Sequence, residues 1–460
     1  MYVISCSPLV KNSGKESFSY FSKQNVPLGS LIKVPLRGKN VSAIVLEVSA
    51  LQKEKQSVKG APYSLKKLSS INPSTFYYQE TVEAARKTAD FFYTNLGAIL
   101  SNYTPSAILE SGHGIKINPL QVKNKFELLA FQGTEEERIL EYKGLIREYF
   151  ARKRSVFICF PTLEDLTRLQ NELSRGIENY TFGVSSLKSD KEIQTTWKNA
   201  LKEKHPVLIL STPQSLTIPR SDLGLIIMEK ESARFYKSLK RPYPDARLFA
   251  ENLARLYEMP CLFADTALRV ETTFRIENAE INRLPQSKMR ITTTANCALV
   301  DMKKKSSRDS SKSEGTEDVL SKEAVSLIQN SIKNNERVFL FATRRGLSSI
   351  TICKDCRQIV ECHFCHSPVV LHEGKEPYFL CHHCGKKRDA KETCRACGSW
   401  DLRAFGIGIE KAVESIKVLF PKSPFYIVSK DTVKTGKRAR EIIDKFMKGG
   451  GILIGTEMAL

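Results

Sequence analysis

The most constraining feature of the sequence is a run of eight cysteines between Cys353 and Cys397, arranged as four Cys-x-x-Cys pairs, or knuckles. Two thiolates three positions apart on a tight turn can bind one metal ion, and a second knuckle completes a tetrahedral site. Four knuckles therefore predict two closed zinc sites, which are structural because no coordination position is left for chemistry. A segment this short buries little apolar surface, so we expect metal binding to supply much of its folding free energy. The pairs are Cys353/Cys356, Cys362/Cys365, Cys381/Cys384 and Cys394/Cys397.

Spacing alone leaves three ways of combining the knuckles into two sites. The other interpretation of the cysteines is a disulfide framework, but residues 1–10 lack the basic stretch and long apolar core of a signal peptide. Thiols in the cytosol stay reduced, which favours zinc. Histidines among the knuckles could replace a thiolate, although eight cysteines already fill two sites. These histidines are His363, His366, His372, His382 and His383.

The 460-residue chain carries a formal charge of +21, with lysine and arginine spread along its whole length. A chain of this length accommodates about three domains. Such a charge favours a polyanionic partner, in the first place nucleic acid, over a basic protein that has no such partner. The apolar runs are too short to span a bilayer, so we expect a cytoplasmic protein with no membrane partner.

The first part of residues 1–105 is rich in short β-forming runs with glycines at the turns, which predicts a small β-barrel or sandwich. Helical spacing follows over residues 81–93. Phe18 and Tyr20 stand in a basic stretch, and aromatic rings beside positive charge are how single-stranded nucleic acid is bound. The two rings could equally be core residues.

From about residue 124 short apolar runs alternate with helical stretches, which predicts a parallel sheet covered on both faces. Residues 303–316 are polar, charged and aperiodic, so they are expected to form a linker. A second α/β unit follows, with the knuckles inserted in it. Two such lobes on a basic chain suggest a nucleic-acid motor, but the phosphate loop of such motors, G-x-x-x-x-G-K-[ST], does not occur in the sequence.

Several motifs, in the order in which they occur, resemble the PriA family of replication-restart helicases, also called primosomal protein N′. The resemblance covers nearly the whole chain, and its most specific block is formed by the four knuckles and their flanks. The motifs are Phe18-Ser-Tyr20, Lys33-Val-Pro35, Phe91-Phe-Tyr-Thr-Asn-Leu-Gly97, Asp222-Leu-Gly-Leu-Ile-Ile227, Tyr236-Lys237, Val300-Asp-Met302, Thr343-Arg-Arg-Gly346, Gly406-Ile-Gly408, Phe420-Pro421 and Ile454-Gly-Thr-Glu-Met458.

The resemblance implies an α/β fold in which a β-rich DNA-binding domain precedes two RecA-like helicase lobes with an inserted zinc-binding segment that holds two four-cysteine sites. The boundaries that we expect are 1–105 for a 3′-DNA-end-binding domain, 106–123 for a linker that lacks the family's winged helix, 124–300 for a degenerate lobe 1, 301–320 for a linker, 321–350 for the start of lobe 2, 351–400 for the zinc-binding insertion and 401–460 for a truncated remainder of lobe 2.

The resemblance also implies a nested pairing of the knuckles. Cys353, Cys356, Cys394 and Cys397 would hold the first zinc, and Cys362, Cys365, Cys381 and Cys384 the second. Residues predicted to contact DNA are Phe18, Tyr20, Arg37, Lys66, Tyr236, Lys237, Arg344 and Arg345. The sequence departs from the family at Ser19, where relatives often carry an aspartate, and at Arg37, where a glycine is usual.

The nucleotide motifs depart further. Glu137 falls near the place of the phosphate-loop lysine and Arg138 near that of the threonine, and an acidic run at a helix start repels a triphosphate. Lys230 falls where the family has the carboxylate that activates the attacking water, and an ammonium cannot accept that proton. Glu229 could still reach a magnesium ion. The family's Ser-Ala-Thr-Pro coupling motif is replaced by residues 264–267, Ala-Asp-Thr-Ala.

We therefore predict a DNA-binding factor, similar to primosomal protein N′, that acts in replication restart at stalled forks, has lost its ATPase and has no catalytic residues. Two structural zinc ions are the expected cofactors, and ATP with magnesium is doubtful. The expected partners are forked or single-stranded DNA with 3′ ends, replication-restart proteins and single-stranded-DNA-binding protein. The alternative is an active ATP-dependent 3′→5′ DNA helicase. Residues 234–243, rich in aromatic and basic side chains, form either a further DNA contact or a solvated basic loop.

Overall fold

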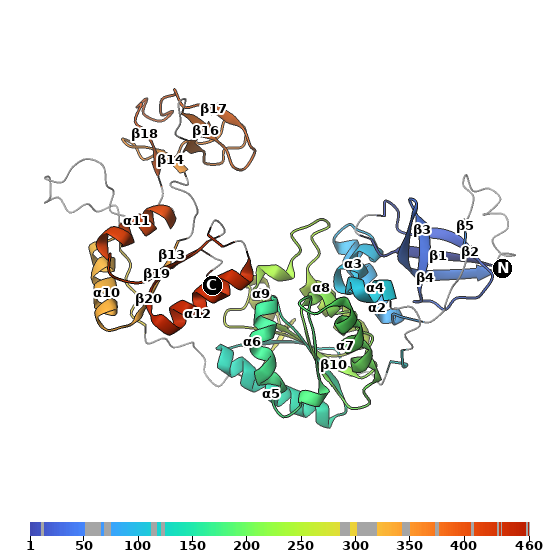
Figure 1. Ribbon diagram of the computed structural model, residues 1–460. Helices are drawn as coiled ribbons and strands as arrows, with labels where there is room; N and C mark the ends of the chain where they lie inside the picture. Colours follow the sequence, from blue (N-terminus) through green and yellow to red (C-terminus); the bar gives the residue numbers. More distant parts are fainter. Residues whose placement is uncertain are drawn as a thin grey trace. The chain divides into compact units, whose positions relative to one another are not determined.

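The computed structural model describes residues 1–10, 13–50, 66–68, 75–111, 117–120, 125–285, 295–300, 320–342, 350–372, 377–405, 409–429, 432–433, 435–456 and 459. The chain forms two compact units, Met1–Thr293 and Thr294–Leu460 (Figure 1). No helix in these described residues is long and apolar enough to cross a membrane.

The chain begins with a five-stranded sheet in the order β3-β4-β1-β2-β5. Neighbouring strands are antiparallel except β2 and β5. One face covers a small core that includes Ile4, Val34 and Val45. Among the described strands β3 and β5 are edges, so the predicted β-rich unit is an open sheet and not a closed barrel. The strands are β1 (Tyr2–Pro8), β2 (Phe18–Ser22), β3 (Leu31–Leu36), β4 (Lys39–Ala50) and β5 (Lys66–Lys67).

Three helices join this sheet to the next one: α2 (Gln79–Phe91), α3 (Leu96–Tyr103) and α4 (Ser106–Ser111). Leu31 and Ile44 from the second face of the β-sheet share one core with these helices and with the following lobe. Residues 106–111 were predicted to belong to a linker but form α4, because Ile108 and Leu109 are buried in that core. The domain boundaries given above remain predictions.

The second sheet of the first unit has seven parallel strands in the order β12-β6-β11-β10-β7-β9-β8. The strands are β6 (Leu128–Gln132), β7 (Ser155–Cys159), β8 (Thr181–Val184), β9 (Leu208–Ser211), β10 (Leu223–Glu229), β11 (Cys261–Asp265) and β12 (Asn282–Arg283). The helices are α5 (Glu135–Ala151), α6 (Leu163–Ser174), α7 (Asp190–Lys202), α8 (Ala246–Tyr257) and α9 (Val270–Glu277), with short 3-10 turns at Glu178–Tyr180, Pro213–Ser215 and Arg234–Tyr236.

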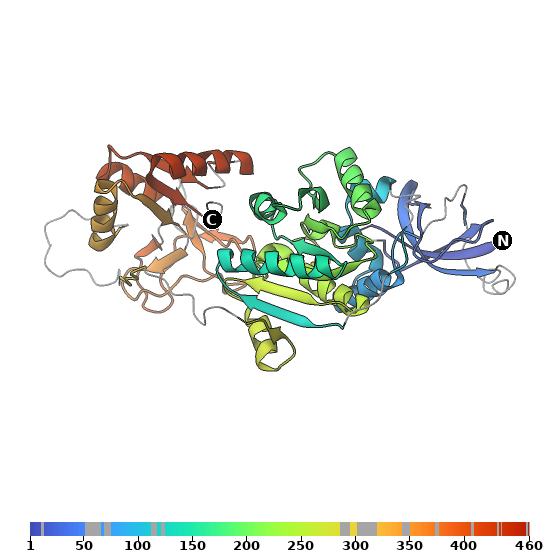
Figure 2. The same ribbon diagram turned by 90° about the horizontal axis from the view of Figure 1, so that it is seen from below.

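Helices cover both faces of this sheet, as the continuous apolar strands predict. Within β10 the side chains alternate: Leu225 and Ile227 pack with α5 and α6, whereas Ile226 and Met228 pack with α7 and α8. Figure 1 shows the two helix layers on either side of the strands, and Figure 2 shows α5 lying along them. The carboxyl ends of the strands therefore share one edge, where ligands of open α/β sheets bind.

The second unit contains a parallel sheet in the order β13-β20-β19. Ile328 and Ile416 from α10 and α11 pack on one face of the sheet, and Phe446 from α12 packs on the other. The elements are β13 (Arg337–Phe341), β19 (Phe425–Val428), β20 (Gly451–Gly455), α10 (Lys322–Lys333), α11 (Ile409–Leu419) and α12 (Gly436–Gly449).

Between β13 and α11 the chain forms the cysteine-rich segment. Its ends pair as the antiparallel strands β14 (Ile350–Cys353) and β18 (Leu402–Phe405). Inside lies a small antiparallel sheet of β15 (Val370–His372), β16 (Tyr378–Leu380) and β17 (Lys387–Asp389). Such short strands bury few apolar groups, so the segment needs another source of stability.

Candidate metal centres and the altered nucleotide site

The eight cysteines form two clusters of four. Cys353, Cys356, Cys394 and Cys397 make one cluster, and Cys362, Cys365, Cys381 and Cys384 make the other. In each cluster the four sulfur atoms lie within 4.8 Å of one another, so each cluster could hold a metal ion. This arrangement agrees with the nested pairing that the resemblance implied, out of the three pairings that spacing allowed.

The four knuckles share one backbone geometry. The amide that follows the second cysteine donates to the carbonyl of the first at 2.8–3.0 Å, as Gly385 does to Cys381. That following residue has a positive φ in all four turns: Arg357, His366, Gly385 and Gly398. A positive φ is strained for any residue except glycine, so Arg357 and His366 indicate that the turn geometry itself is required.

The distances fit a tetrahedral metal site better than disulfides. The nearest sulfur pairs across the knuckles are 3.5–3.6 Å apart, for example Cys353 and Cys397 at 3.5 Å. Four thiolates at a zinc–sulfur distance of about 2.3 Å would lie roughly 3.8 Å from one another. A disulfide requires about 2.05 Å, and all eight cysteines are unpaired.

The pKa values of the cluster thiols are shifted in both directions: backbone amides lower some of them toward the thiolate form that a metal requires, whereas neighbouring thiols raise others, such as that of Cys384. The backbone amide of Ser367 donates to Cys365 and lowers the pKa of its thiol to about 5. The amide of Cys356 acts likewise on Cys353 and lowers the pKa of that thiol to about 7. Among the described residues no histidine joins either cluster. His372 instead stacks on Tyr378, with ring centroids 5.2 Å apart.

The place where a phosphate loop would lie is occupied by a very short connection. Only Gly133 and Thr134 separate β6 from α5. Thr134 caps α5, and the Glu137 carboxylate accepts from the Thr134 amide at 2.9 Å, so a side chain of the protein satisfies this helix start. A phosphate loop needs a longer stretch of backbone that wraps around the phosphates. This connection cannot do so.

Arg138 fills the space next to that connection. Its guanidinium donates to both carboxylate oxygens of Glu229, at 3.0 and 2.8 Å, and also to Thr266 at 2.7 Å. Tyr142 donates to the same carboxylate at 2.5 Å. Burial alone would lower the pKa of Arg138, but the hydrogen bonds and charge of Glu229 raise it above the usual value, so the pair is ionic. The expectation that Glu229 could reach a magnesium ion does not fit this geometry.

Lys230 is also engaged within the protein. Its ammonium lies 2.6 Å from Asp165 in α6, and it has a positive φ of 49°. The hydrogen bonds from Lys230 and Thr162 outweigh the effect of burial and lower the pKa of Asp165. In place of the coupling motif, the Asp265 carboxylate accepts from the amides of Ser232 and Thr266. The sequence predicted that charged residues such as Lys230 stand at these positions, but it did not predict which residues they pair with.

Two aromatic residues predicted to contact DNA are core residues. Tyr20 is 4% exposed and donates to the Pro35 carbonyl at 3.1 Å. Tyr236 is 2% exposed, and its hydroxyl reaches the carbonyls of Cys159 and Glu229 at 2.7 and 2.5 Å. Neither ring can stack on a base in this arrangement, so these two predictions are corrected.

The other predicted contacts differ in accessibility. Phe18 is half-buried against the N-terminal core, whereas Arg37, Lys66 and Lys237 are exposed. Arg344 and Arg345 lie outside the described residues.

Residues 234–243 are called the basic-aromatic loop below. Some of its exposed side chains were not singled out from the sequence pattern. Phe235 is 55% exposed, Leu239 86% and Tyr243 44%. Lys237, Lys240 and Arg241 are exposed on the same loop. The signal that could have found Phe235 is its position beside Tyr236, since adjacent residues of a 3-10 turn face different ways.

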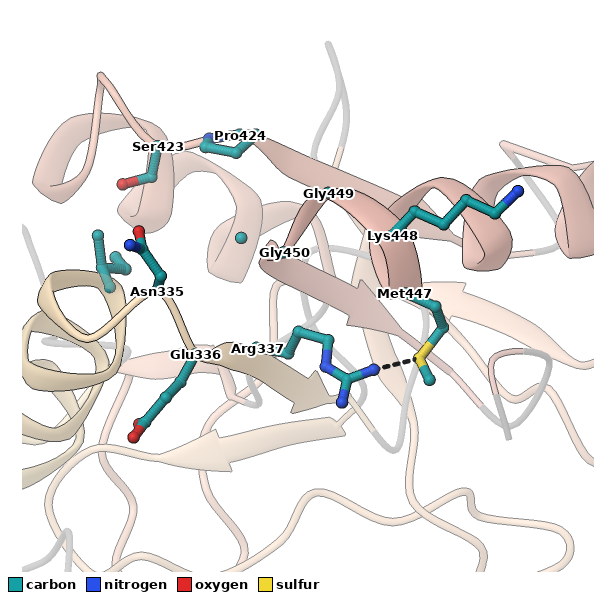
Figure 3. Close-up of a pocket in the computed structure, with 11 residues that line it drawn as sticks. Asn335, Glu336, Arg337, Ser423, Pro424, Met447, Lys448, Gly449 and Gly450 are labelled. Atoms are coloured by element: carbon teal, nitrogen blue, oxygen red, sulfur yellow. Dashed lines mark hydrogen bonds between the residues drawn. The ribbon is translucent and has the colours of Figure 1, made fainter.

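A separate hollow lies at the amino ends of β13, β19 and β20. Arg337 points toward Met447 there, with its guanidinium 3.2 Å from the sulfur, and Lys448 extends outward (Figure 3). Ligands of open parallel sheets bind at the carboxyl ends of the strands, so this hollow is at the wrong edge for a nucleotide.

The comparisons with known proteins agree with the motif order. No family model matches the chain. Replication restart protein PriA from Rickettsia felis is 26% identical over 461 residues, which is 94% of this chain and 67% of the relative. PriA from Helicobacter pylori 26695 is 25% identical over 456 residues, 96% of this chain and 69% of the relative. PriA from Bacillus subtilis is 23% identical over 320 residues, 69% of this chain and 39% of the relative.

Among solved structures, the UvsW helicase from bacteriophage T4 matches with a TM-score of 0.25 and 9% identity, covering 51% of this chain and 66% of that one. A TM-score this low does not indicate a shared fold.

The fold and the clusters place this protein in the class of helicase-like α/β proteins, as predicted. The features that do so are the N-terminal β-sheet, the parallel sheets typical of helicase lobes and the inserted pair of four-cysteine clusters. Within that class the chain is similar to replication restart protein PriA, and the resemblance read from the motifs is confirmed. The chain spans about two thirds of the length of the Rickettsia and Helicobacter relatives.

Proposed function

We propose that this protein is a DNA-binding, PriA-like factor that acts in replication restart at stalled forks without hydrolysing ATP. The observation that carries the proposal is the buried pair of Arg138 and Glu229 at the carboxyl edge of the lobe sheet. A guanidinium there supplies the positive charge that a magnesium ion and phosphate-binding lysine would otherwise supply. Nucleotide would have to displace an ion pair held inside the protein.

The remaining contacts of this edge support the same proposal. The two-residue connection between β6 and α5 offers no backbone cradle, and the Glu137 carboxylate already uses the amide of Thr134. Lys230 cannot act as general base, because it is a cation paired with Asp165. A residual ATPase would need a different water-activating group.

DNA is the proposed partner on grounds of charge and exposed rings. The formal charge is +21, and the basic-aromatic loop presents Phe235 and Tyr243 next to Lys237. Aromatic faces beside cations bind single strands without sequence preference. Exposed Arg37 and Lys66 on the N-terminal sheet would contact phosphates of a forked or 3′-ended DNA.

Zinc is the metal that we propose for both clusters, because four thiolates at these separations suit a tetrahedral ion. Each zinc ion would be structural and would hold the cysteine-rich segment folded. The further partners that we propose, replication-restart proteins and single-stranded-DNA-binding protein, are those that the resemblance to the PriA family implies. We propose the cytoplasm as the location, since free cysteines suit a reducing compartment.

The decisive experiment measures DNA-stimulated ATP hydrolysis and forked-DNA binding on one zinc-loaded sample. Binding without hydrolysis is the expected result. DNA-stimulated hydrolysis above background by the unaltered protein would favour the alternative, an active 3′→5′ helicase. Failure to bind forked DNA at moderate salt would overturn both functions.

A further inference from the structure

The basic-aromatic loop is attached to the lobe sheet through Tyr236. The Tyr236 ring is buried inside the lobe, and its hydroxyl contacts the carbonyls of Cys159 and Glu229, the last residues of β7 and β10. Its neighbour Phe235 is 55% exposed. One residue thus holds the loop to the carboxyl edge of the sheet while the next residue faces the surroundings.

A second attachment closes the loop at its far end. Arg247 donates to both carboxylate oxygens of Asp245 and to the Glu231 carbonyl at 2.6 Å. Its guanidinium also lies 5.7 Å from the Tyr236 ring centroid. The loop therefore leaves and re-enters the lobe through ordered contacts, and Tyr236 is the one fully buried residue among residues 234–243.

Glu229 belongs to both the loop attachment and the buried ion pair. Its backbone carbonyl accepts from Tyr236, while its carboxylate accepts from Arg138 and Tyr142. Glu229 is fully buried. If the two-pronged contact with Arg138 is lost, the Glu229 carboxylate loses the group that fixes its position inside the lobe. Because that side chain and the carbonyl that Tyr236 contacts belong to one residue at the end of β10, we expect the attachment of Tyr236 to loosen with it.

We propose that Arg138 is a positioning residue for DNA binding: it fixes Glu229, and through Tyr236 it holds the basic-aromatic loop ready for single-stranded DNA with no nucleotide bound. This inference rests on the proposed DNA-binding function and names the residue that keeps the loop in position for binding. Arg138 itself is 1% exposed, so its side chain is too buried to contact DNA directly. Its effect passes through two hydrogen bonds, from the Arg138 guanidinium to the Glu229 carboxylate and from the Tyr236 hydroxyl to the Glu229 carbonyl.

The test uses Arg138→Lys in the full zinc-loaded chain, which keeps the charge but loses the two-pronged contact. The probe is a fluorescent oligothymidine, and its affinity is measured by anisotropy. We expect the affinity to fall by about tenfold, the equivalent of one lost base stack. Should the lysine variant not fold, Tyr236→Phe is measured instead, with the same expectation, because it removes the hydroxyl that holds the loop to the Glu229 carbonyl and keeps the buried ring.

Arg220→Lys is the matched control. Arg220 also forms a buried two-pronged pair, with Asp222 at 2.6 and 2.9 Å, but beside the opposite end of β10. It should leave the affinity of the folded protein unchanged. If Arg220→Lys lowers the affinity as much as Arg138→Lys, the effect is general destabilisation and the inference is overturned.

A double-mutant cycle with Tyr243→Ala separates positioning from independent effects. Tyr243 is 44% exposed in the loop, so its loss removes a DNA contact. If Arg138 acts through the loop, Arg138→Lys has little further effect in the Tyr243→Ala background. Fully additive losses overturn the inference but leave the proposed function standing. No binding by the unaltered protein overturns the proposed function itself.

Discussion

Arg138 and Glu229 lie 91 positions apart in the sequence and meet through two hydrogen bonds of 3.0 and 2.8 Å, with each side chain 1% exposed. Helix α5 supplies the cation and the last residue of β10 supplies the anion. The edge of the sheet where a nucleotide would bind is thus closed by an ion pair of the chain's own residues.

Removing one partner of this pair should destabilise lobe 1 strongly. For Arg138→Ala we expect a loss of about 3–5 kcal/mol in the free energy of unfolding, because a buried carboxylate loses its cation. Urea unfolding followed by the fluorescence of Trp197, which is fully buried in this lobe, measures it. The control is Arg168→Ala, whose pair with Glu135 is exposed and should be worth less than about 1 kcal/mol. Equal losses in the two variants would contradict the prediction.

The number of zinc ions bound per chain should equal the number of intact four-cysteine clusters. The purified protein is expected to contain two zinc ions per chain by atomic absorption. Cys394→Ser should lower the content to one, because three thiolates and one hydroxyl bind zinc poorly. Cys297→Ser is the control, since Cys297 is exposed and belongs to neither cluster, and it should leave both ions in place.

The pairing of the knuckles has its own test. Cys353→Ser with Cys394→Ser should remove a single zinc, because both residues belong to one cluster. Cys353→Ser with Cys362→Ser should remove both. The opposite result in these two double variants would exclude the nested arrangement.

The metal centres were predictable because their signal is local. A knuckle consists of residues three positions apart, and the turn between them is set by those residues, so Cys381 and Cys384 could be read directly. The alternation of apolar strands and helices was local too, and it gave the parallel sheets. Which knuckles combine depends on how β14 and β18 come together, and spacing carries no such information.

Exposure at the candidate DNA sites could not be read in the same way. Tyr20 and Tyr236 have the same basic surroundings as Phe235, yet their rings are buried and their hydroxyls satisfied by carbonyls. Burial of a ring depends on contacts with residues far along the chain, such as Cys159 for Tyr236. The pairing of Arg138 could not be predicted either, because it too depends on a residue far along the chain. A glutamate at the end of an apolar strand does indicate that some cation lies nearby.

Exposed cations of the N-terminal sheet should contribute to DNA affinity through phosphate contacts. Lys66→Ala and Arg37→Ala are each expected to weaken single-strand binding and to lower the salt dependence, the slope of log affinity against log salt, by about 0.7. Anisotropy titrations between low and moderate salt measure both quantities. Lys191→Ala on α7 removes an exposed cation from elsewhere and serves as the control. An unchanged slope for Lys66→Ala and Arg37→Ala would exclude phosphate contact by these residues.

The ion pair of Asp165 and Lys230 should make lobe 1 sensitive to acid. Because the hydrogen bonds from Lys230 and Thr162 lower the pKa of Asp165 below its ordinary 3.8, the ionised carboxylate favours the folded state. This contribution is complete well above pH 3.8 and disappears as the pH falls through the lowered pKa. The unaltered protein should therefore be more stable than Asp165→Asn at pH 6, and the difference should shrink toward pH 3. Urea unfolding at several pH values, again followed through Trp197, measures this difference, and exposed Asp444→Asn should show none. A difference that stays constant from pH 6 to pH 3 would mean that Asp165 stabilises the lobe through its shape and not through its charge.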